Sequence, residues 1–282
     1  MKAAVADYRY RIVCMRIVPV TGSSIYLTDH VKDLTMGGHT YLAAYGYQFS
    51  GYSATADFSP ASIDIEGIAA AAGMTRAMIS SGVFDGARCY CFATTWVNPV
   101  EDEEPITAGI FGKATLLDDK YQMSGTSLVD VLNQTVGLTY SVQCPKKFCG
   151  TEYAGCGVSL AANTVTGVLT SVTSASVFYS SARTEPDDTF GAGTIQFISG
   201  PNAGLKPIEI KSFVSGVITT HEPFYYLPMV GDSYSMVRGC RKRSSDCKNR
   251  WNGSSYYSNI VNFGGDEHIP LGSTYAQYGK NR

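Results

Sequence analysis

The sequence predicts a mainly β protein with two β-rich domains and a few short helices. Charged residues make up only 16% of the chain, and Gly, Tyr, Thr and Ser are plentiful. This composition favours strands and turns over long amphipathic helices, because β-branched and aromatic side chains suit a pleated sheet. The 282 residues suffice for one large domain or two ordinary ones, each with its own hydrophobic core.

The first half of the chain alternates short apolar runs with turn residues. Residues 9–20 and 23–30 lie around the turn TGSS, a pattern that is typical of a β-hairpin. Further strands are expected in the segments 37–46, 46–68, 88–96, 106–119 and 121–128. In the second of these, the expected buried positions are Phe58, Ile63, Ile65 and Ile68.

Two short helices are expected among these strands. The stretch 69–72 is all alanine, and Gly73 interrupts it, which predicts a break or a restart near Thr75. A second helix is expected where Leu128, Val131 and Leu132 are spaced as on one helical face.

The pattern of residue types in the sequence changes at Cys144. From there to about Asp232, runs of β-branched and aromatic residues alternate with Gly and Asn turns, which predicts further strands. The tail after Val237 loses this periodicity and becomes basic, aromatic and rich in glycine. We therefore expect an N-terminal β-rich domain at 1–138 and a C-terminal β-rich domain at 139–282 that ends in an irregular tail.

Five of the eight cysteines fall in two loops that are far apart in the chain. Cys144, Cys149 and Cys156 share one loop, and Cys240 and Cys247 share the other. Five thiols in turn-rich segments can converge on one centre, and four thiolates suffice for a zinc ion or an iron–sulfur cluster, so one is expected to be spare. The other three cysteines lie among apolar residues and are expected to be buried free thiols: Cys14, Cys89 and Cys91.

Three other interpretations compete for the loop cysteines: a disulfide framework, buried small hydrophobic side chains, and unconnected free thiols. Disulfide frameworks suit small secreted domains, whereas charged residues interrupt the start of this chain where a signal peptide needs an apolar stretch. No segment approaches the length of a membrane span, so a product made in the cytoplasm is expected.

Several segments resemble the tail-hub proteins of long-tailed phages and gene transfer agents. The resemblance runs through nearly the whole chain, including residues 28–51, 82–96, 106–144 and 238–250. The signature of the second domain in that family falls here on Cys144, Cys156, Gly157, Val158, Gly239, Cys240, Cys247, Asn262, Phe263, Gly264, Gly265, His268, Ile269 and Pro270.

The resemblance implies a viral structural protein of the tail tip or baseplate, located in the virion tail. It implies a β-rich ring, trimeric in the family, below the tail tube and in contact with distal tail and other tail-tip proteins. It also implies a structural [4Fe–4S] cluster in the C-terminal domain. Carried over residue by residue, the cluster ligands are Cys144, Cys156, Cys240 and Cys247, with the extra Cys149 as a substitute ligand.

The charge pattern agrees with a thiolate site. Six cations surround the second cysteine loop and are opposed only by Asp246: Arg238, Arg241, Lys242, Arg243, Lys248 and Arg250. Nearby cations favour a thiolate over a thiol. The net charge of −2 gives no overall attraction for nucleic acid, so stable nucleic-acid binding is not expected.

Catalysis is not expected either. The four histidines are scattered, and no known catalytic motif is present. Thr28, Asp29 and His30 with Asp33 are interpreted as a polar turn that ends an early strand. His268 is expected to order the C-terminal loop, with a metal-ligand role as the alternative.

A different class of function is a soluble host metalloprotein with iron–sulfur or zinc and a redox or sensing role. Such a protein would be a self-contained monomer with exposed, reversibly oxidised cysteines. A hub would instead form oligomers.

Overall fold

The computed structural model describes residues 8–43, 48–52, 62–69, 73–128, 140–151 and 155–267. The described chain is mainly β, as predicted. It divides into two compact units: unit 1 is Met1–Thr135 with Gly204–Lys206, and unit 2 is Val136–Ala203 with Pro207–Arg282. The domain boundary expected near residue 138 lies outside the described residues.

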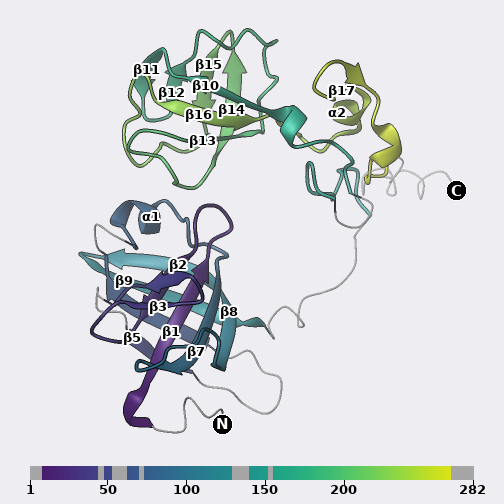
Figure 1. Ribbon diagram of the computed structural model, residues 1–282. Coiled ribbons are helices and arrows are strands. Elements are labelled where there is room, and N and C mark those ends of the chain that lie inside the picture. The colour runs from purple at the N-terminus through teal and green to yellow at the C-terminus, as the bar shows by residue number, and fades with distance from the viewer. Residues whose placement is uncertain are drawn as a thin grey trace, which may run out of the picture. The chain divides into compact units, whose positions relative to one another are not determined.

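Unit 1 is built on a seven-stranded antiparallel sheet that curls around its core (Figure 1). The strand order is β2-β1-β7-β8-β9-β6-β5. These strands are β1 Arg11–Val18, β2 Ile25–Thr28, β5 Gln48–Tyr52, β6 Ser62–Ile68, β7 Arg88–Thr95, β8 Glu104–Leu117 and β9 Lys120–Ser127. Pairing of β1 with β2 confirms the hairpin predicted around TGSS, and the strands predicted in the later segments of this half are also present.

The central strands β1 and β7 are buried on both faces. Met15 of β1 and Cys91 of β7 belong to one core cluster, whereas Cys14 and Phe92, the residues next to them, belong to a second. The second cluster includes Leu34 and residues of the hairpin formed by β3 (Leu34–Met36) and β4 (His39–Tyr41). Burial on two faces explains why these strands are nearly continuous apolar runs rather than alternating ones.

Cys14, Cys89 and Cys91 are buried free thiols, as predicted. Burial raises the pKa of each of them above its ordinary value. A thiol whose pKa is raised is a poor nucleophile and a poor metal ligand at neutral pH. These three cysteines therefore contribute packing rather than chemistry.

The first predicted helix is present in short form as α1, Arg76–Ser80. It begins after Gly73, and the side chain of Thr75 caps it by accepting a hydrogen bond from the Met78 amide at 3.2 Å, which confirms the predicted restart. Residues 70–72 and the helix predicted around 131 lie outside the described residues, as does Phe58.

One predicted core position in β6 is wrong. Ile65 is fully buried, but Ile68 is 48% exposed. The two residues are three positions apart, so the alternation of a strand places them on opposite faces of the sheet. The side chain of Ile63 lies outside the described residues.

Unit 2 contains a second seven-stranded sheet, with the order β10-β16-β13-β14-β15-β12-β11. Its strands are β10 Thr164–Val168, β11 Ser171–Ser174, β12 Val177–Tyr179, β13 Thr194–Phe197, β14 Ile208–Val214, β15 Val217–Thr220 and β16 Ser233–Val237. The two end strands, β10 and β11, follow each other directly and are separated only by Leu169 and Thr170. They are thus two halves of one bent strand, and the sheet closes into a small barrel.

Aromatic side chains fill this barrel. Phe178, Phe197 and Phe224 contact one another through their rings, and Phe190 meets Phe213 edge to face with ring centroids 4.9 Å apart. All of them belong to one buried cluster. Such edge-to-face contacts add to the stabilisation that comes from burial of apolar area.

The rest of unit 2 consists of short elements that follow or precede the barrel. They are α2 Ser244–Lys248, β17 Arg250–Trp251, β18 Tyr256–Tyr257 and the 3-10 helices Ala161–Asn163 and Ile260–Asn262. In Figure 1 these elements lie beside the barrel. Among the described helices of the whole chain, none has the length and apolar character needed to cross a membrane.

We expect truncation of Phe213 to destabilise unit 2 strongly. Phe213→Ala removes a fully buried ring from the barrel and should lower the free energy of unfolding by about 3–5 kcal/mol. Its neighbour Val214 is 51% exposed, and Val214→Ala should change stability by no more than about 0.5 kcal/mol. Urea unfolding of the full chain measures both, and equal losses would contradict the assignment of this core.

Candidate functional site

Two segments that are far apart in the chain meet in unit 2, as the cysteine pattern predicted. The amide of Cys144 donates to the carbonyl of Lys242 at 2.9 Å, and the ammonium of Lys146 donates to the carbonyl of Asn262 at 2.9 Å. The amide of Asp266 also donates to the carbonyl of Ser141. The first cysteine loop therefore lies against the basic tail.

Asn259 holds the two cysteine segments together. Its side-chain Nδ2 donates to the carbonyl of Cys156 at 2.8 Å, and its backbone amide donates to the carbonyl of Cys247 at 2.7 Å. Its Oδ1 accepts a hydrogen bond from Asn262 Nδ2 at 2.8 Å, and the residue is only 4% exposed. One buried residue thus links both segments, through its side-chain amide to Cys156 and through its backbone amide to Cys247.

The backbone next to Cys156 depends on glycine. Gly157 has a positive φ of 68°, and a Cβ at this position would lie 2.9 Å from Nδ2 of Asn262. Only glycine adopts this conformation without strain and leaves room for the amide. The Cys-Gly pair predicted as part of the signature is therefore required by the packing around Asn259.

A buried guanidinium lies among the thiols. Arg250 is 6% exposed, and its Nη2 donates to the sulfur of Cys240 at 2.7 Å while Nη1 donates to the carbonyl of Gly239 at 3.3 Å. Its Cζ also lies 5.2 Å from the centre of the Phe148 ring. Among the described residues, no carboxylate pairs with Arg250, and its Nε has no hydrogen-bond partner.

Four of the five loop thiols interact electrostatically around this cation. Burial raises the pKa of Cys149 to about 11, with a further contribution from Cys156, while Arg250 lowers it. Burial likewise raises the pKa of Cys247, and the charge and hydrogen bond of Arg250 lower it, while Cys240 and Cys156 raise it. The pKa values of Cys149 and Cys247 therefore each depend on a thiol of the other cysteine segment.

Cys144 has a different environment. Its sulfur accepts a hydrogen bond from the amide of Gly264 at 3.4 Å, and the thiol is partly exposed. It does not contribute to the electrostatic interactions of Cys149 or Cys247. Across the described residues, no group of three or more His, Cys, Asp or Glu side chains is arranged to hold a metal ion.

Three of the other predicted cations have partners away from the thiols. Arg241 forms an ion pair with Asp188, and Lys242 donates to the carbonyl of Lys146. Arg238 lies over the ring of Trp251 at 5.1 Å. Of the six cations expected near the thiols, Arg250 is the one that donates to a thiol in the described structure.

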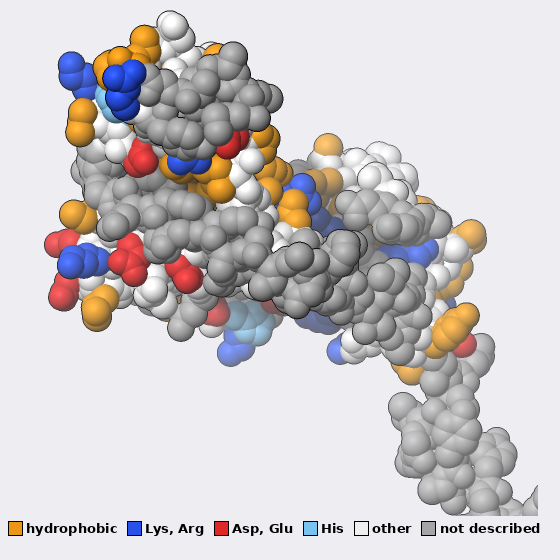
Figure 2. Space-filling view, turned by 90° about the horizontal axis from the view of Figure 1, so that it is seen from below, with side chains coloured by type: hydrophobic (Ala, Val, Ile, Leu, Met, Phe, Trp, Pro, Cys, Tyr) orange, Lys and Arg blue, Asp and Glu red, His pale blue; other side chains and the backbone are white. Residues whose placement is uncertain are grey.

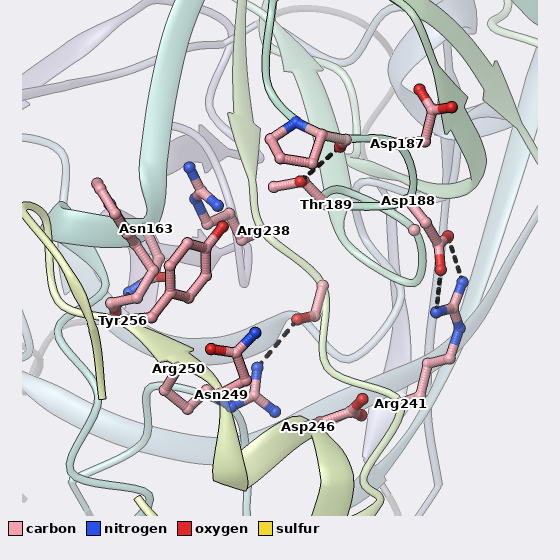
Figure 3. Close-up of a pocket in the computed structure, with 14 residues that line it drawn as sticks. Asn163, Asp187, Asp188, Thr189, Arg238, Arg241, Asp246, Asn249, Arg250 and Tyr256 are labelled. Carbon is pink, nitrogen blue, oxygen red and sulfur yellow. Dashed lines mark hydrogen bonds and ion pairs between the residues drawn. The ribbon is translucent and has the colours of Figure 1, made fainter. Parts of the chain in front are cut away.

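Beside the thiols lies a polar cavity of about 300 Å³ (Figure 3). Three arginines and three aspartates line it, so positive and negative charges are balanced there: Arg238, Arg241, Arg250, Asp187, Asp188 and Asp246. None of its lining residues is a cysteine. The cavity is therefore adjacent to the thiols but separate from them.

The remaining predicted positions have structural roles or lie outside the description. Asp29 accepts a hydrogen bond from the Val13 amide and Asp33 accepts one from the Ala43 amide, which agrees with a polar turn. His30 stacks on Trp96. The terminal positions His268, Ile269 and Pro270 lie outside the described residues.

Sequence reasoning missed two features of this site. Cys247 lies on the short helix α2 rather than in a loop, and Asn259 was not identified as a link between the segments. A single sequence does not mark Asn259 as a linking residue, because asparagine is common in turns for other reasons.

The fold is shared with a virion protein. A chain of a solved structure described as the virion of a native gene transfer agent particle matches with a TM-score of 0.78 and 20% identity, over 96% of this chain and 93% of that chain. No curated protein matches this chain significantly. The class defined by this fold is that of a mainly β protein with two compact units.

Two family models divide the chain between them. The model described as baseplate hub protein, N-terminal attachment domain, matches residues 7–159, which is more than half of the chain. A second, described as phage conserved hypothetical protein BR0599, matches residues 188–272. The chain belongs to the baseplate hub protein family, and its location is the tail of a phage-like virion.

We expect Asn259 to be critical for the stability of this region. Asn259→Ala would leave the Cys156 carbonyl and the Asn262 amide without partners, at a cost of about 2–4 kcal/mol. Asn249→Ala is the control, because Asn249 is exposed and its loss should cost less than about 0.5 kcal/mol. Urea unfolding followed by Trp251 fluorescence measures both, and a neutral Asn259→Ala variant would contradict the role of this amide.

Proposed function

We propose that this baseplate hub protein acts as a ring of identical subunits, a trimer, below the tail tube. In this position it contacts the distal tail and other tail-tip proteins. The match of residues 7–159 to a baseplate hub attachment domain carries the proposal, and the shared fold with a gene transfer agent virion protein supports it. The role is mechanical, with no catalytic residue.

Exposed apolar side chains on both units suit subunit contacts. In unit 1, Trp96 is 42% exposed and touches the ring of Tyr10, while Val97 is 51% exposed. In unit 2, one short loop exposes a run of apolar residues: Tyr225, Tyr226, Leu227, Met229 and Val230. Aromatic residues and methionine are enriched in protein interfaces, and large exposed apolar patches mark binding surfaces.

The surface charge does not favour nucleic-acid binding. Figure 2 shows acidic and basic side chains mixed on one face rather than a basic surface. The net charge is −2, and stable binding of a phosphate backbone requires clustered cations. A hub through which a genome passes is better served by a surface that does not retain it.

We further propose that four of the five loop cysteines hold a structural [4Fe–4S] cluster, with zinc as the alternative metal. The family resemblance implies Cys144, Cys156, Cys240 and Cys247, with Cys149 as the substitute. In the described structure no three of these thiols are arranged to hold a metal ion, so the proposal rests on the family resemblance, on the convergence of the two cysteine segments and on charge. Four thiolates carry negative charge, and the buried Arg250 offers a positive charge that no described carboxylate neutralises.

A bound cluster would act as a cross-link between the two cysteine loops. It would close a loop of about a hundred residues, and by analogy with a disulfide of that span it would stabilise unit 2 by about 4–5 kcal/mol. In this role the cluster needs no redox turnover. Asn259 and Gly157 would keep the loops positioned around it.

We expect the protein, purified anaerobically from iron-replete cells, to be brown and to contain several irons per chain. Visible absorption and metal analysis on the same sample measure this. One zinc per chain in a colourless protein would preserve the cross-link and refute the iron–sulfur cluster. A metal-free, well-folded monomer would refute both the cluster and the ring.

We expect Cys240→Ser to prevent correct assembly. In cells that produce the particles, replacement of the wild-type gene by this variant should yield particles without complete tails, because unit 2 would lose a ligand of the cross-link. Ser245→Ala, on the exposed face of α2, is the matched control and should assemble normally. Complete tails containing Cys240→Ser, seen by electron microscopy, would argue against the proposal.

A further inference from the structure

The polar cavity of unit 2 lies where the barrel meets the segment that follows it. The loop 186–191 forms one wall, and Arg238 and Gly239 form a second directly after β16. Residues of α2 and β17 complete the lining. A buried water needs only about 10–15 Å³ of such space, so a cavity of about 300 Å³ has room for a small polyatomic ion.

The carboxylates that line this cavity are already engaged with other groups. Asp188 forms an ion pair with Arg241 through two hydrogen bonds, which lower the pKa of Asp188. Asp187 accepts a hydrogen bond from a backbone amide at 2.8 Å, and Asp246 accepts one at 3.4 Å from the amide of the residue that precedes α2. Asp187 and Asp188 are also exposed, so water screens their charge.

Arg238 has no partner of this kind. Its Cζ lies 5.1 Å from the centre of the Trp251 ring and 5.5 Å from that of the Phe190 ring. Its Nε is buried, and within the described part of the chain its guanidinium makes no hydrogen bond or ion pair. The two rings hold the guanidinium in place by cation–π contact and leave its N–H groups available at the cavity wall.

Arg250 adds a second positive charge to the lining. It is 6% exposed, and its Nη atoms donate to a thiol and a backbone carbonyl rather than to a carboxylate. In Figure 3, Arg238 lies on the other side of the cavity from the pair of Asp188 and Arg241. The charges are therefore equal in number but unequally paired, because two guanidinium groups have no carboxylate partner among the described residues.

We infer that this cavity binds a small oxyanion, a carboxylate or a phosphate, with Arg238 as its main ligand and Arg250 as a supporting charge. A guanidinium presents a planar fork of N–H donors that matches two oxygens of either group. A partly buried cation without a negative partner is costly, and a bound oxyanion removes that cost. The site needs no metal group in the cysteine segments, so it goes beyond the proposed function and does not depend on it.

Two sources supply this chemistry: free phosphate, and the side-chain carboxylate of an acidic residue in another protein of the particle. Inorganic phosphate is the probe for the first source, and acetate is the probe for the second. In either case the anion would lie between the end of the barrel and the elements α2 and β17. It would thereby strengthen the connection between these two parts of unit 2.

The test measures anion binding by the full chain through tryptophan fluorescence. Trp251 lines the cavity and contacts Arg238, and Trp96 is the one other tryptophan of the sequence. In a Trp96→Phe background the fluorescence therefore reports on the cavity wall. Phosphate and acetate are each titrated at constant ionic strength against sodium chloride. We expect a saturable change with at least one of them and none with chloride.

Variants of Arg238 locate the site. Arg238→Gln should weaken binding by about tenfold or more, because charge-assisted hydrogen bonds are lost. Arg238→Lys keeps the charge but not the planar fork, and it should also bind more weakly than the wild type. Lys211→Gln is the matched control, since it removes one positive charge from an exposed position of β14 outside the cavity. Circular dichroism checks folding, and Arg238→Lys decides the test if Arg238→Gln does not fold.

Each outcome bears on the inference. Tighter binding of phosphate supports the site with a free phosphate as its ligand, and equal or tighter binding of acetate supports it with an acidic side chain. The absence of a saturable response to both anions would overturn it. Wild-type affinity in Arg238→Lys, or equal weakening in Lys211→Gln, would overturn it as well. Metal content is not a readout here, so failure of this site leaves the proposed cluster and ring unaffected.

Discussion

The arrangement of unit 2 outside its barrel depends on one buried positive charge. The guanidinium of Arg250 has almost no access to water, and its described partners are a thiol, a carbonyl and an aromatic ring. A cation in such a place is costly unless negative charge lies beside it. The thiol of Cys240 is within hydrogen-bond reach of this cation, and the proposed metal group would keep such thiols deprotonated beside it.

The eight cysteines of the chain fall into two sets that differ in environment rather than in chemistry. Cys14, Cys89 and Cys91 lie in apolar cores of unit 1, where burial alone determines their pKa or dominates it. The thiols of unit 2 are also buried in part, but Arg250 opposes the effect of burial on Cys149 and Cys247. The presence of one cation thus distinguishes the environment of these two thiols from that of the packing thiols in unit 1.

Much of the fold could be predicted from the sequence, because strand patterns and turns are local signals. The β1–β2 hairpin, the strands of the 88–127 region and the start of α1 at Thr75 all follow from residues within a few positions of one another. Ile68 differs from the prediction because it lies three positions from the buried Ile65 and therefore on the opposite face of the strand. The convergence of the two cysteine segments was also predictable, since clustered loop cysteines are uncommon.

The details of the site could not be predicted in the same way. The contact of Arg250 with the Phe148 ring and the link from Asn259 to Cys156 join segments about a hundred residues apart. The positive φ of Cys149 is likewise invisible in sequence, because the residue is neither glycine nor asparagine. Family resemblance supplied a ligand set by position, whereas three-dimensional contacts distinguish between neighbouring cysteines.

The bend at Leu169 and Thr170 has a further consequence for assembly. Because β10 and β11 are halves of one strand, each has a partner strand on one side only, and the edges that they leave are short: five residues in β10 and four in β11. Short edge strands hinder a partner from extending the sheet with a strand of its own, which is a common and poorly selective mode of association. Recognition of this unit is therefore expected to use the side chains of its loops, where sequence differences between related particles can exclude the wrong neighbour.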